Sequence, residues 1–130
     1  MSRGLLDTSV FIAREGRGLD TAKIPDEVAV SVVTYGELRA GVLAATDLTV
    51  RSRRLSTLQT VAELEPLPIT AAVADEWATL RLLLAQAGRR VNVNDTWIAA
   101  TALAHDVPVV SQDDDYGTLA ELSPLRVIAV

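Results

Sequence analysis

Short, β-branched apolar segments alternate along this chain with longer segments whose apolar residues recur at helical spacing. Strands separated by helices usually pair in parallel, because the crossover helix returns the chain to the same end of the sheet. The apolar segments are continuous, which is typical of strands buried on both faces. The pattern therefore predicts an α/β fold with a central, mostly parallel β-sheet and helices on both of its faces.

The expected elements follow from this pattern. We predict strands at Gly4–Leu6 (ending at Asp7), Val28–Thr34, Leu67–Ile69, Val109–Ser111 and Arg126–Val130. We predict helices at Val10–Glu15, Tyr35–Ala45, within Thr46–Glu65, at Ala71–Ala87, from Asn94–Asp95 to His105, and at Leu119–Leu122. An apolar stripe along Ala71–Ala87 faces the core, and Gly88 ends that helix.

Length and composition limit the possibilities. The 130 residues suit a single domain over residues 1–130, and the 49% of hydrophobic residues favour a well-filled core or a further apolar face buried in a dimer or against a partner. No apolar run approaches the roughly 20 residues of a membrane span, and the first residues show no signal-peptide pattern. The chain has no cysteine. We therefore expect a cytoplasmic protein without disulfides, thiolate metal sites or membrane contact.

The charge balance restricts the chemistry further. A single histidine, His105, argues against a Ser–His–Asp triad or a histidine-rich metal site, so catalysis would have to use carboxylates. The net charge of −5 repels nucleic acid at long range and argues against a simple nucleic-acid-binding module. It argues less against a metal-dependent enzyme, because bound divalent cations would offset that charge where a phosphate must approach.

Four acidic residues follow predicted strands or open predicted helices: Asp7, Glu37, Asp95 and Asp113. Taken singly, each has an ordinary explanation as a helix cap, a first-turn acid or part of a solvated turn. In a parallel sheet, however, all four positions lie on the same rim. Converging carboxylates need neutralisation, and oxygen-only ligands suit Mg²⁺ or Mn²⁺. Such ions can activate a water molecule and stabilise the oxygens of a phosphodiester, which predicts phosphate-ester hydrolysis.

Other phosphotransfer designs fit less well. A haloacid-dehalogenase-type phosphatase needs a second Asp where this chain has Ser9, and a receiver domain needs a late lysine, whereas the only lysine is Lys23. No P-loop motif occurs. A basic cluster remains, which forms either a solvated face or a surface for RNA or a partner; it consists of Arg51, Arg53 and Arg54.

Four motifs, in order along nearly the whole chain, resemble the PIN-domain ribonucleases of the VapC toxin type. They are Leu6–Ile12 (LDTSVFI), Ser31–Thr34 with Glu37, Leu38 and Gly41, Asn94–Asp95 with Ile98–Leu103, and Val110–Tyr116 (VSQDDDY). Each motif alone is weak, and the four in register are specific. The chain departs from the family where Ser111–Gln112 stands in place of a frequent Thr–Arg.

The resemblance implies a PIN-like fold and a Mg²⁺- or Mn²⁺-dependent endoribonuclease, the toxin of a type II toxin–antitoxin pair. It implies a homodimer, a VapB-type antitoxin whose C-terminal segment covers the active site, and an RNA substrate such as tRNA or rRNA. The residues that match the family's catalytic and metal-binding positions are Asp7, Glu37, Asp95 and Asp113, with Asp115 as a further metal ligand and Thr8, Ser9 and Asn94 in support.

Two alternatives stay open at this point. The chain could keep this fold and act as a non-catalytic PIN-like interaction module, or it could be a metal-dependent phosphohydrolase acting on another phosphoester. The acid of the run Asp113–Asp115 that does the work is also open.

Overall fold

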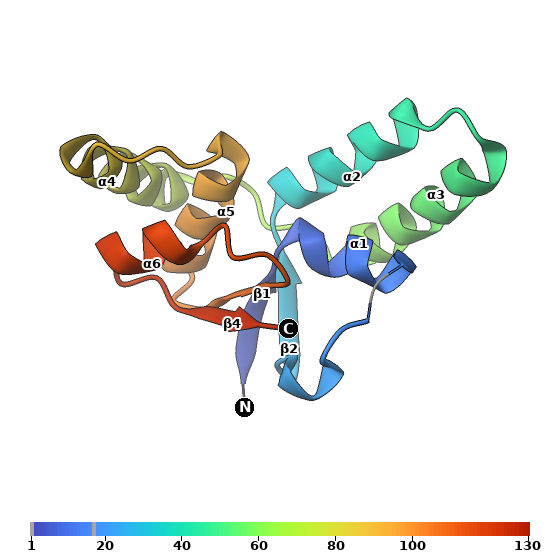
Figure 1. Cartoon of the computed structure of the whole chain (residues 1–130), viewed down its shortest axis with the longest axis horizontal. Helices are drawn as coiled ribbons and strands as arrows, with labels where there is room; N and C mark the ends of the chain where they lie inside the picture. The colour runs from blue at the N-terminus through green and yellow to red at the C-terminus, as the bar shows by residue number, and fades with distance from the viewer. Residues whose placement is uncertain (1, 17) are drawn as a thin grey trace.

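The structure, a computed structural model, describes residues 2–16 and 18–130 and has a four-stranded parallel sheet in the order β2-β1-β3-β4 (Figure 1). This agrees with the predicted α/β class. The strands are β1 (Arg3–Leu6), β2 (Glu27–Val30), β3 (Val109–Ser111) and β4 (Val127–Ala129). The α-helices are α1 (Thr8–Gly16), α2 (Val32–Ala44), α3 (Leu48–Glu63), α4 (Ala71–Ala87), α5 (Val93–Ala104) and α6 (Gly117–Leu122), and one 3₁₀ turn is formed by Thr21–Lys23.

The sheet separates two apolar cores, as predicted for strands covered on both faces. Leu5 and Val109 point into a core shared with α4, α5 and α6, whereas Leu6 and Val110 point into a core shared with α1, α2 and α3. Neighbouring residues of one strand serve opposite faces, because side chains alternate along a strand. The two helix groups rise on either side of the sheet and give the molecule the outline of a V (Figure 1).

Two of the predicted strands were wrong in extent. The apolar run Val28–Thr34 does not continue as a strand, because the Ser31 hydroxyl accepts a hydrogen bond from the Thr34 N–H and starts α2 at Val32. An N-cap of this kind overrides the β propensity of the valines that follow it. Leu67–Ile69 forms only an isolated parallel bridge, between Leu67 and Ser31.

The long helix α4 was predicted correctly at both ends. Val73, Leu80 and Leu84 are buried, and Gly88 ends the helix in the left-handed conformation with φ 64°. On α2, Leu38 and Val42 are buried, whereas Leu43 is 63% exposed.

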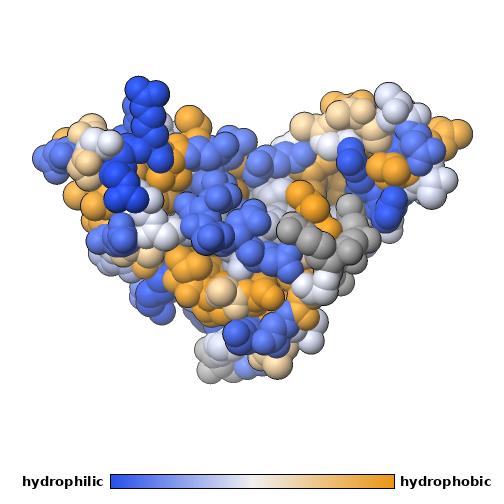
Figure 2. All heavy atoms as spheres, in the orientation of Figure 1, coloured by the Kyte–Doolittle hydropathy of each residue, from blue (hydrophilic) through white to orange (hydrophobic). Residues whose placement is uncertain are grey.

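The order of the strands creates a switch point beside β1. The chain leaves β1 through α1 to reach β2 on one side, whereas β3 pairs with the other side of β1. Sheets of this kind place their ligand sites in the crevice outside the carboxyl ends of the strands at such a point. This crevice opens into the V, and the space-filling view is hollowed there (Figure 2). Among the described residues, no helix is long and apolar enough to cross a bilayer.

Candidate active site

Asp7 lies at the switch point, directly after β1, and its side chain is only 4% exposed. Its carboxylate accepts three hydrogen bonds: from the Tyr116 hydroxyl at 2.7 Å, from the Ser111 hydroxyl at 3.0 Å and from the Ser9 N–H at 3.3 Å. Its backbone carbonyl accepts from the Val10 N–H and so opens α1. Asp7 is therefore both a helix cap and a buried carboxylate held in one orientation by three donors.

A relay of serine hydroxyls fixes the Oδ2 side of Asp7. The Ser111 hydroxyl donates its single proton to Asp7, so the Ser9 hydroxyl, 3.2 Å away, must donate to Ser111. Ser9 in turn accepts from the Gln112 N–H at 3.0 Å, and Ser111 accepts from the Asp113 N–H at 3.0 Å. The sequence prediction gave a supporting hydroxyl to Ser9 or Thr8. The serine hydroxyl that donates directly to Asp7 is that of Ser111, and the Ser9 hydroxyl acts through it.

Asp95 lies in the first turn of α5, as predicted, but it does not cap the helix. The cap is Asn92, whose Oδ1 accepts from the N–H groups of Asn94 at 2.9 Å and Asp95 at 3.4 Å. With the cap supplied by this earlier residue, the Asp95 carboxylate turns toward Asp7. The predicted helper Asn94 is exposed, and its backbone N–H is the group that donates to the cap.

Tyr116 joins the two aspartates. Its ring is 1% exposed, and its hydroxyl oxygen lies 2.7 Å from Asp7 Oδ1 and 3.4 Å from Asp95 Oδ1. Burial and the nearby carboxylate of Asp7 raise the pKa of Tyr116 far above the ordinary value of 10.0, so the phenol remains a proton donor. The sequence prediction used Tyr116 only as the aromatic that marks its motif. The hydroxyl of a buried tyrosine usually finds a hydrogen-bond partner, and this rule could have predicted that Tyr116 contacts a polar group of the site.

Glu37 reaches the same rim from the second turn of α2, not from its first turn as predicted, because α2 begins earlier. Its Oε1 accepts a hydrogen bond from the Thr8 hydroxyl at 2.7 Å, and Thr8 Oγ1 also lies 3.0 Å from Thr34 Oγ1. Thr8 therefore positions the carboxylate of Glu37 rather than that of Asp7.

The acidic run after β3 divides between two surroundings. Asp115 is close enough to Asp95 for its charge to raise the Asp95 pKa. Asp113 lines a separate cavity of about 340 Å³ beside Gly117 and Val127. Of the two predicted ligands in this run, Asp115 is therefore the one that the structure brings into electrostatic contact with Asp95.

The carboxylates share one electrostatic environment. Burial raises the pKa of Asp95 from 3.8 to about 6, together with the negative charges of Asp7, Asp115 and Glu37 and against the opposing hydrogen bond from Tyr116. These groups repel one another unless a proton or a cation lies among them.

An oxygen-only donor set of this kind fits Mg²⁺ or Mn²⁺. Among the side chains that the structure describes, no three acidic, histidine or cysteine residues come close enough to hold one ion together. Mg²⁺ does not require that, because it commonly keeps several waters and uses only one or two carboxylates. Asp7 and Asp95, which face each other across the Tyr116 hydroxyl, are such a pair.

Comparison with known proteins agrees with this arrangement. The family model described as PIN domain matches residues 4–122. The chain belongs to the PIN-domain family. It is 53% identical over 128 residues to Ribonuclease VapC5 of Mycobacterium tuberculosis (strain ATCC 25618 / H37Rv), covering 98% of this chain and 95% of that one. It is 45% identical over 126 residues to Ribonuclease VapC4 of the same strain, covering 96% and 97% of the two chains.

A solved structure shares the whole PIN fold of this chain. The crystal structure of VapBC-5 from Mycobacterium tuberculosis, a member of the VapBC family of toxin-antitoxin systems, superposes with a TM-score of 0.92 at 50% identity over 100% of both chains. FitAcB from Neisseria gonorrhoeae superposes with a TM-score of 0.74 at 26% identity, covering 95% of each chain. The predicted family is thereby confirmed.

The predicted arginine cluster of this PIN domain does not act as one unit. Arg51 donates to the carbonyls of Val42 at 3.3 Å and Leu43 at 3.5 Å, and Arg54 donates to the Gly41 carbonyl at 2.8 Å. Two of the three arginines thus cap the last carbonyls of α2, which favour a cation. Arg54 also shares a cavity of about 270 Å³ with the Glu37 side of the acidic site.

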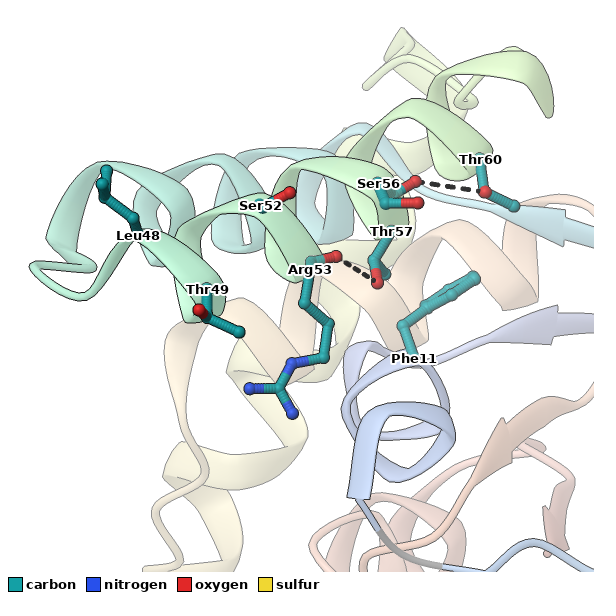
Figure 3. Close-up of a pocket in the computed structure, with 8 residues that line it drawn as sticks. All are labelled: Phe11, Leu48, Thr49, Ser52, Arg53, Ser56, Thr57 and Thr60. Atoms are coloured by element: carbon teal, nitrogen blue, oxygen red, sulfur yellow. Dashed lines mark hydrogen bonds between the residues drawn. The ribbon is translucent and has the colours of Figure 1, made fainter.

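Arg53 lies elsewhere, in a cavity of about 740 Å³ between α1 and α3. Its side chain and that of Phe11 extend into this space (Figure 3). The rest of the lining is mostly hydroxyls from α3, and two of these, Thr57 and Thr60, donate to carbonyls of the preceding turn. The described residues that line this cavity include no carboxylate, so it is a surface separate from the acidic site.

Proposed function

We propose that this PIN-domain chain is a divalent-metal-dependent endoribonuclease and the toxin of a type II toxin–antitoxin pair. The observation that carries the proposal is the convergence of Asp7, Glu37, Asp95 and Asp115 at the switch point, with Tyr116 between the two central aspartates. Curated relatives up to 53% identical are named ribonucleases, which supports RNA as the substrate. A module that only binds partners has no need for mutually repelling carboxylates in its crevice.

The residues that would hold Mg²⁺ or Mn²⁺ are Asp7 and Asp95, with Glu37 and an acid of the run after β3 completing the set. Asp115 is favoured over Asp113 in that role because its charge acts on Asp95. When bound, the ion supplies a water of lowered pKa and neutralises the phosphodiester. The protein's own contribution is orientation: the hydroxyls of Tyr116 and Ser111 keep the Asp7 carboxylate from rotating, and the Thr8 hydroxyl does the same for Glu37.

The partner in this proposal is a VapB-type antitoxin. The solved structures similar to this chain include that of VapBC-5, which supports a cognate antitoxin here. The cavity between α1 and α3 and the neighbouring apolar side chains of Ile12 (49% exposed) and Leu48 (79% exposed) offer an uncovered surface for one. We also propose a homodimer, since the chain exposes several large apolar residues.

The test is cleavage of end-labelled tRNA and rRNA fragments by chain freed of any co-purifying antitoxin, in Mg²⁺, in Mn²⁺ and in EDTA. Asp95→Asn should abolish the cuts while keeping the fold, because it preserves shape and removes the charge that the cation needs. Asp26→Asn is the matched control, an exposed aspartate near the start of β2, at the opposite edge of the sheet. Full activity of Asp95→Asn would refute the site.

The alternatives predict other results. Metal binding without cleavage of any RNA, but with hydrolysis of a model phosphodiester, would indicate a phosphohydrolase of different substrate. Neither metal binding nor cleavage would leave a PIN-like interaction module.

A further inference from the structure

A basic pocket lies on the lobe formed by α4 and α5, outside the acidic site. Its volume is about 340 Å³, within the lower range of ligand pockets, and three of its lining residues are arginines: Arg81, Arg89 and Arg90. All three are exposed, in a chain whose net charge is −5. Figure 2 shows strongly hydrophilic side chains projecting from this lobe. A concentration of cations in an acidic protein points to an anionic ligand.

One of the three arginines is engaged in internal polar contacts, and the other two are available to a ligand. Arg89 donates to the Thr118 hydroxyl at 2.7 Å and lies 3.5 Å from Glu121. Arg81 lies over the ring of Trp77, at 5.3 Å from the ring centroid, and neither Arg81 nor Arg90 makes an ion pair or a side-chain hydrogen bond among the described side chains. A guanidinium that lies over an indole ring without an ion-pair partner can bind an oxyanion in a bidentate manner.

The wall of the pocket contains a stacked pair of tryptophans. Trp77 is stacked on Trp97 with ring centroids 4.6 Å apart and planes 7° apart, so one face is covered by Trp97 and Arg81 lies over the ring. Its Nε1–H is buried and has no hydrogen-bond acceptor in the described residues. A buried donor without an acceptor costs free energy.

We propose that this pocket, formed by Arg81, Arg90 and Trp77, binds a backbone phosphate of the RNA substrate next to the cleaved bond. Val93 and Thr96 line the pocket and flank Asp95 on the first turn of α5. One helical turn therefore places the pocket and the acidic site on two sides of the same helix end. A strand running over that end would meet the arginines on one side and the carboxylates on the other.

This inference rests on the proposed function, because it takes RNA as the substrate. The recognised group is a phosphate diester, so the contact carries no base specificity and contributes to affinity and to the register of the strand.

The test compares two double variants that change net charge equally. Arg81→Gln/Arg90→Gln removes two positive charges from the pocket. Arg3→Gln/Arg126→Gln removes two from the opposite edge of the sheet, where both arginines are in exposed ion pairs. Both are made in the cleavage-dead Asp95→Asn background. RNA binding is measured at several salt concentrations with a single-stranded oligonucleotide that the wild-type chain cleaves, and far-UV circular dichroism verifies folding.

The pocket variant should bind about ten-fold more weakly, and the slope of log K against log salt should become shallower by about 0.7 for each phosphate that the arginines no longer neutralise. The control variant should keep the RNA affinity and the salt slope of its Asp95→Asn parent within error. Trp77 and Trp97 are the only tryptophans of the sequence, so RNA should also change tryptophan fluorescence in the control and not in the pocket variant.

If Arg81→Gln/Arg90→Gln fails to fold, Arg90→Gln alone decides the matter, since the Arg90 side chain has no hydrogen-bond or ion-pair partner among the described residues whose loss could unfold the chain. An unchanged affinity and salt slope in a chain whose wild type cleaves RNA would overturn the pocket and leave the nuclease standing. The pocket proposal would also be overturned if the variant bound the antitoxin more weakly, or changed its oligomeric state, while its RNA binding stayed intact. A wild type that binds and cleaves no RNA would instead refute the proposed function itself.

Discussion

Asp95→Asn should stabilise the metal-free protein at neutral pH while abolishing its activity. The Asp95 carboxylate is held close to three other negative charges, those of Asp7, Asp115 and Glu37. Asparagine keeps the size of the side chain and its acceptor oxygen for Tyr116, but it removes the charge. A helix-capping aspartate would behave in the opposite way, because its charge favours the helix N-terminus.

The magnitude follows from the pKa. A rise from 3.8 to about 6 corresponds to about 3 kcal/mol against the ionised folded state if the group were fully buried. Asp95 is only half-buried, so solvent screening reduces this to about 1 kcal/mol. Because the pKa of Asp95 is raised in the folded state, the folded state binds the proton more tightly than the unfolded state. The contribution of Asp95 to the free energy of unfolding is therefore complete below pH 3.8 and is lost as the pH rises through about 6.

Urea unfolding of both proteins in EDTA at pH 4 and pH 8 measures this effect. Wild type should lose about 1 kcal/mol of unfolding free energy more than Asp95→Asn between the two pH values. At pH 8 the variant should be the more stable protein, and saturating Mg²⁺ should reverse the order by binding only the wild-type site. A variant that is less stable than wild type at pH 8 in EDTA would refute the reasoning and make Asp95 a structural residue.

Four further changes test the supports of the site and the fold. Tyr116→Phe removes the 2.7 Å donor to buried Asp7 and should cost about 2 kcal/mol of unfolding free energy, measured in urea, with reduced cleavage. Ser111→Ala breaks the relay between Ser9 and Asp7 and should lower kcat through a misoriented Asp7, with the far-UV spectrum unchanged. Gly88→Ala should cost about 1 kcal/mol in thermal unfolding, because the residue has φ 64°; Gly36→Ala, at an uncrowded position inside α2, should instead stabilise by up to about 1 kcal/mol.

Periodicity in the sequence was enough to predict the parallel sheet, the two covered faces and the limits of α4. Where it failed, a single side-chain hydrogen bond decided the outcome. The Ser31 hydroxyl ends the predicted strand Val28–Thr34 early and moves Glu37 into the second turn of α2. Composition within the run gave no sign of this, since valines suit a buried strand and tolerate a helix that is packed on the core.

The acids of the site were predictable from their places at strand ends and helix starts, whereas their supports were not. Tyr116 lies 109 positions after Asp7 in the chain, and Ser111 lies 104 positions after it. Contacts of that separation depend on the pairing of β1 with β3, which a single sequence does not specify. The cap residue Asn92 was missed for a different reason: Asn94 and Asp95 are equally good cap residues and stand close by in the same turn.

The placement of charge explains how an acidic chain can act on RNA. Carboxylates at the switch point repel phosphate, and the net charge of −5 adds to that repulsion at long range. The positive groups on the two arms of the V are therefore the ones that decide approach: Arg81 and Arg90 on the α4–α5 lobe, and Arg53 in the separate cavity between α1 and α3. Arg51 and Arg54 neutralise helix carbonyls and contribute less. Association should consequently depend on a few arginines on the two arms of the V, and a cation in the crevice should strengthen RNA binding as well as enable cleavage.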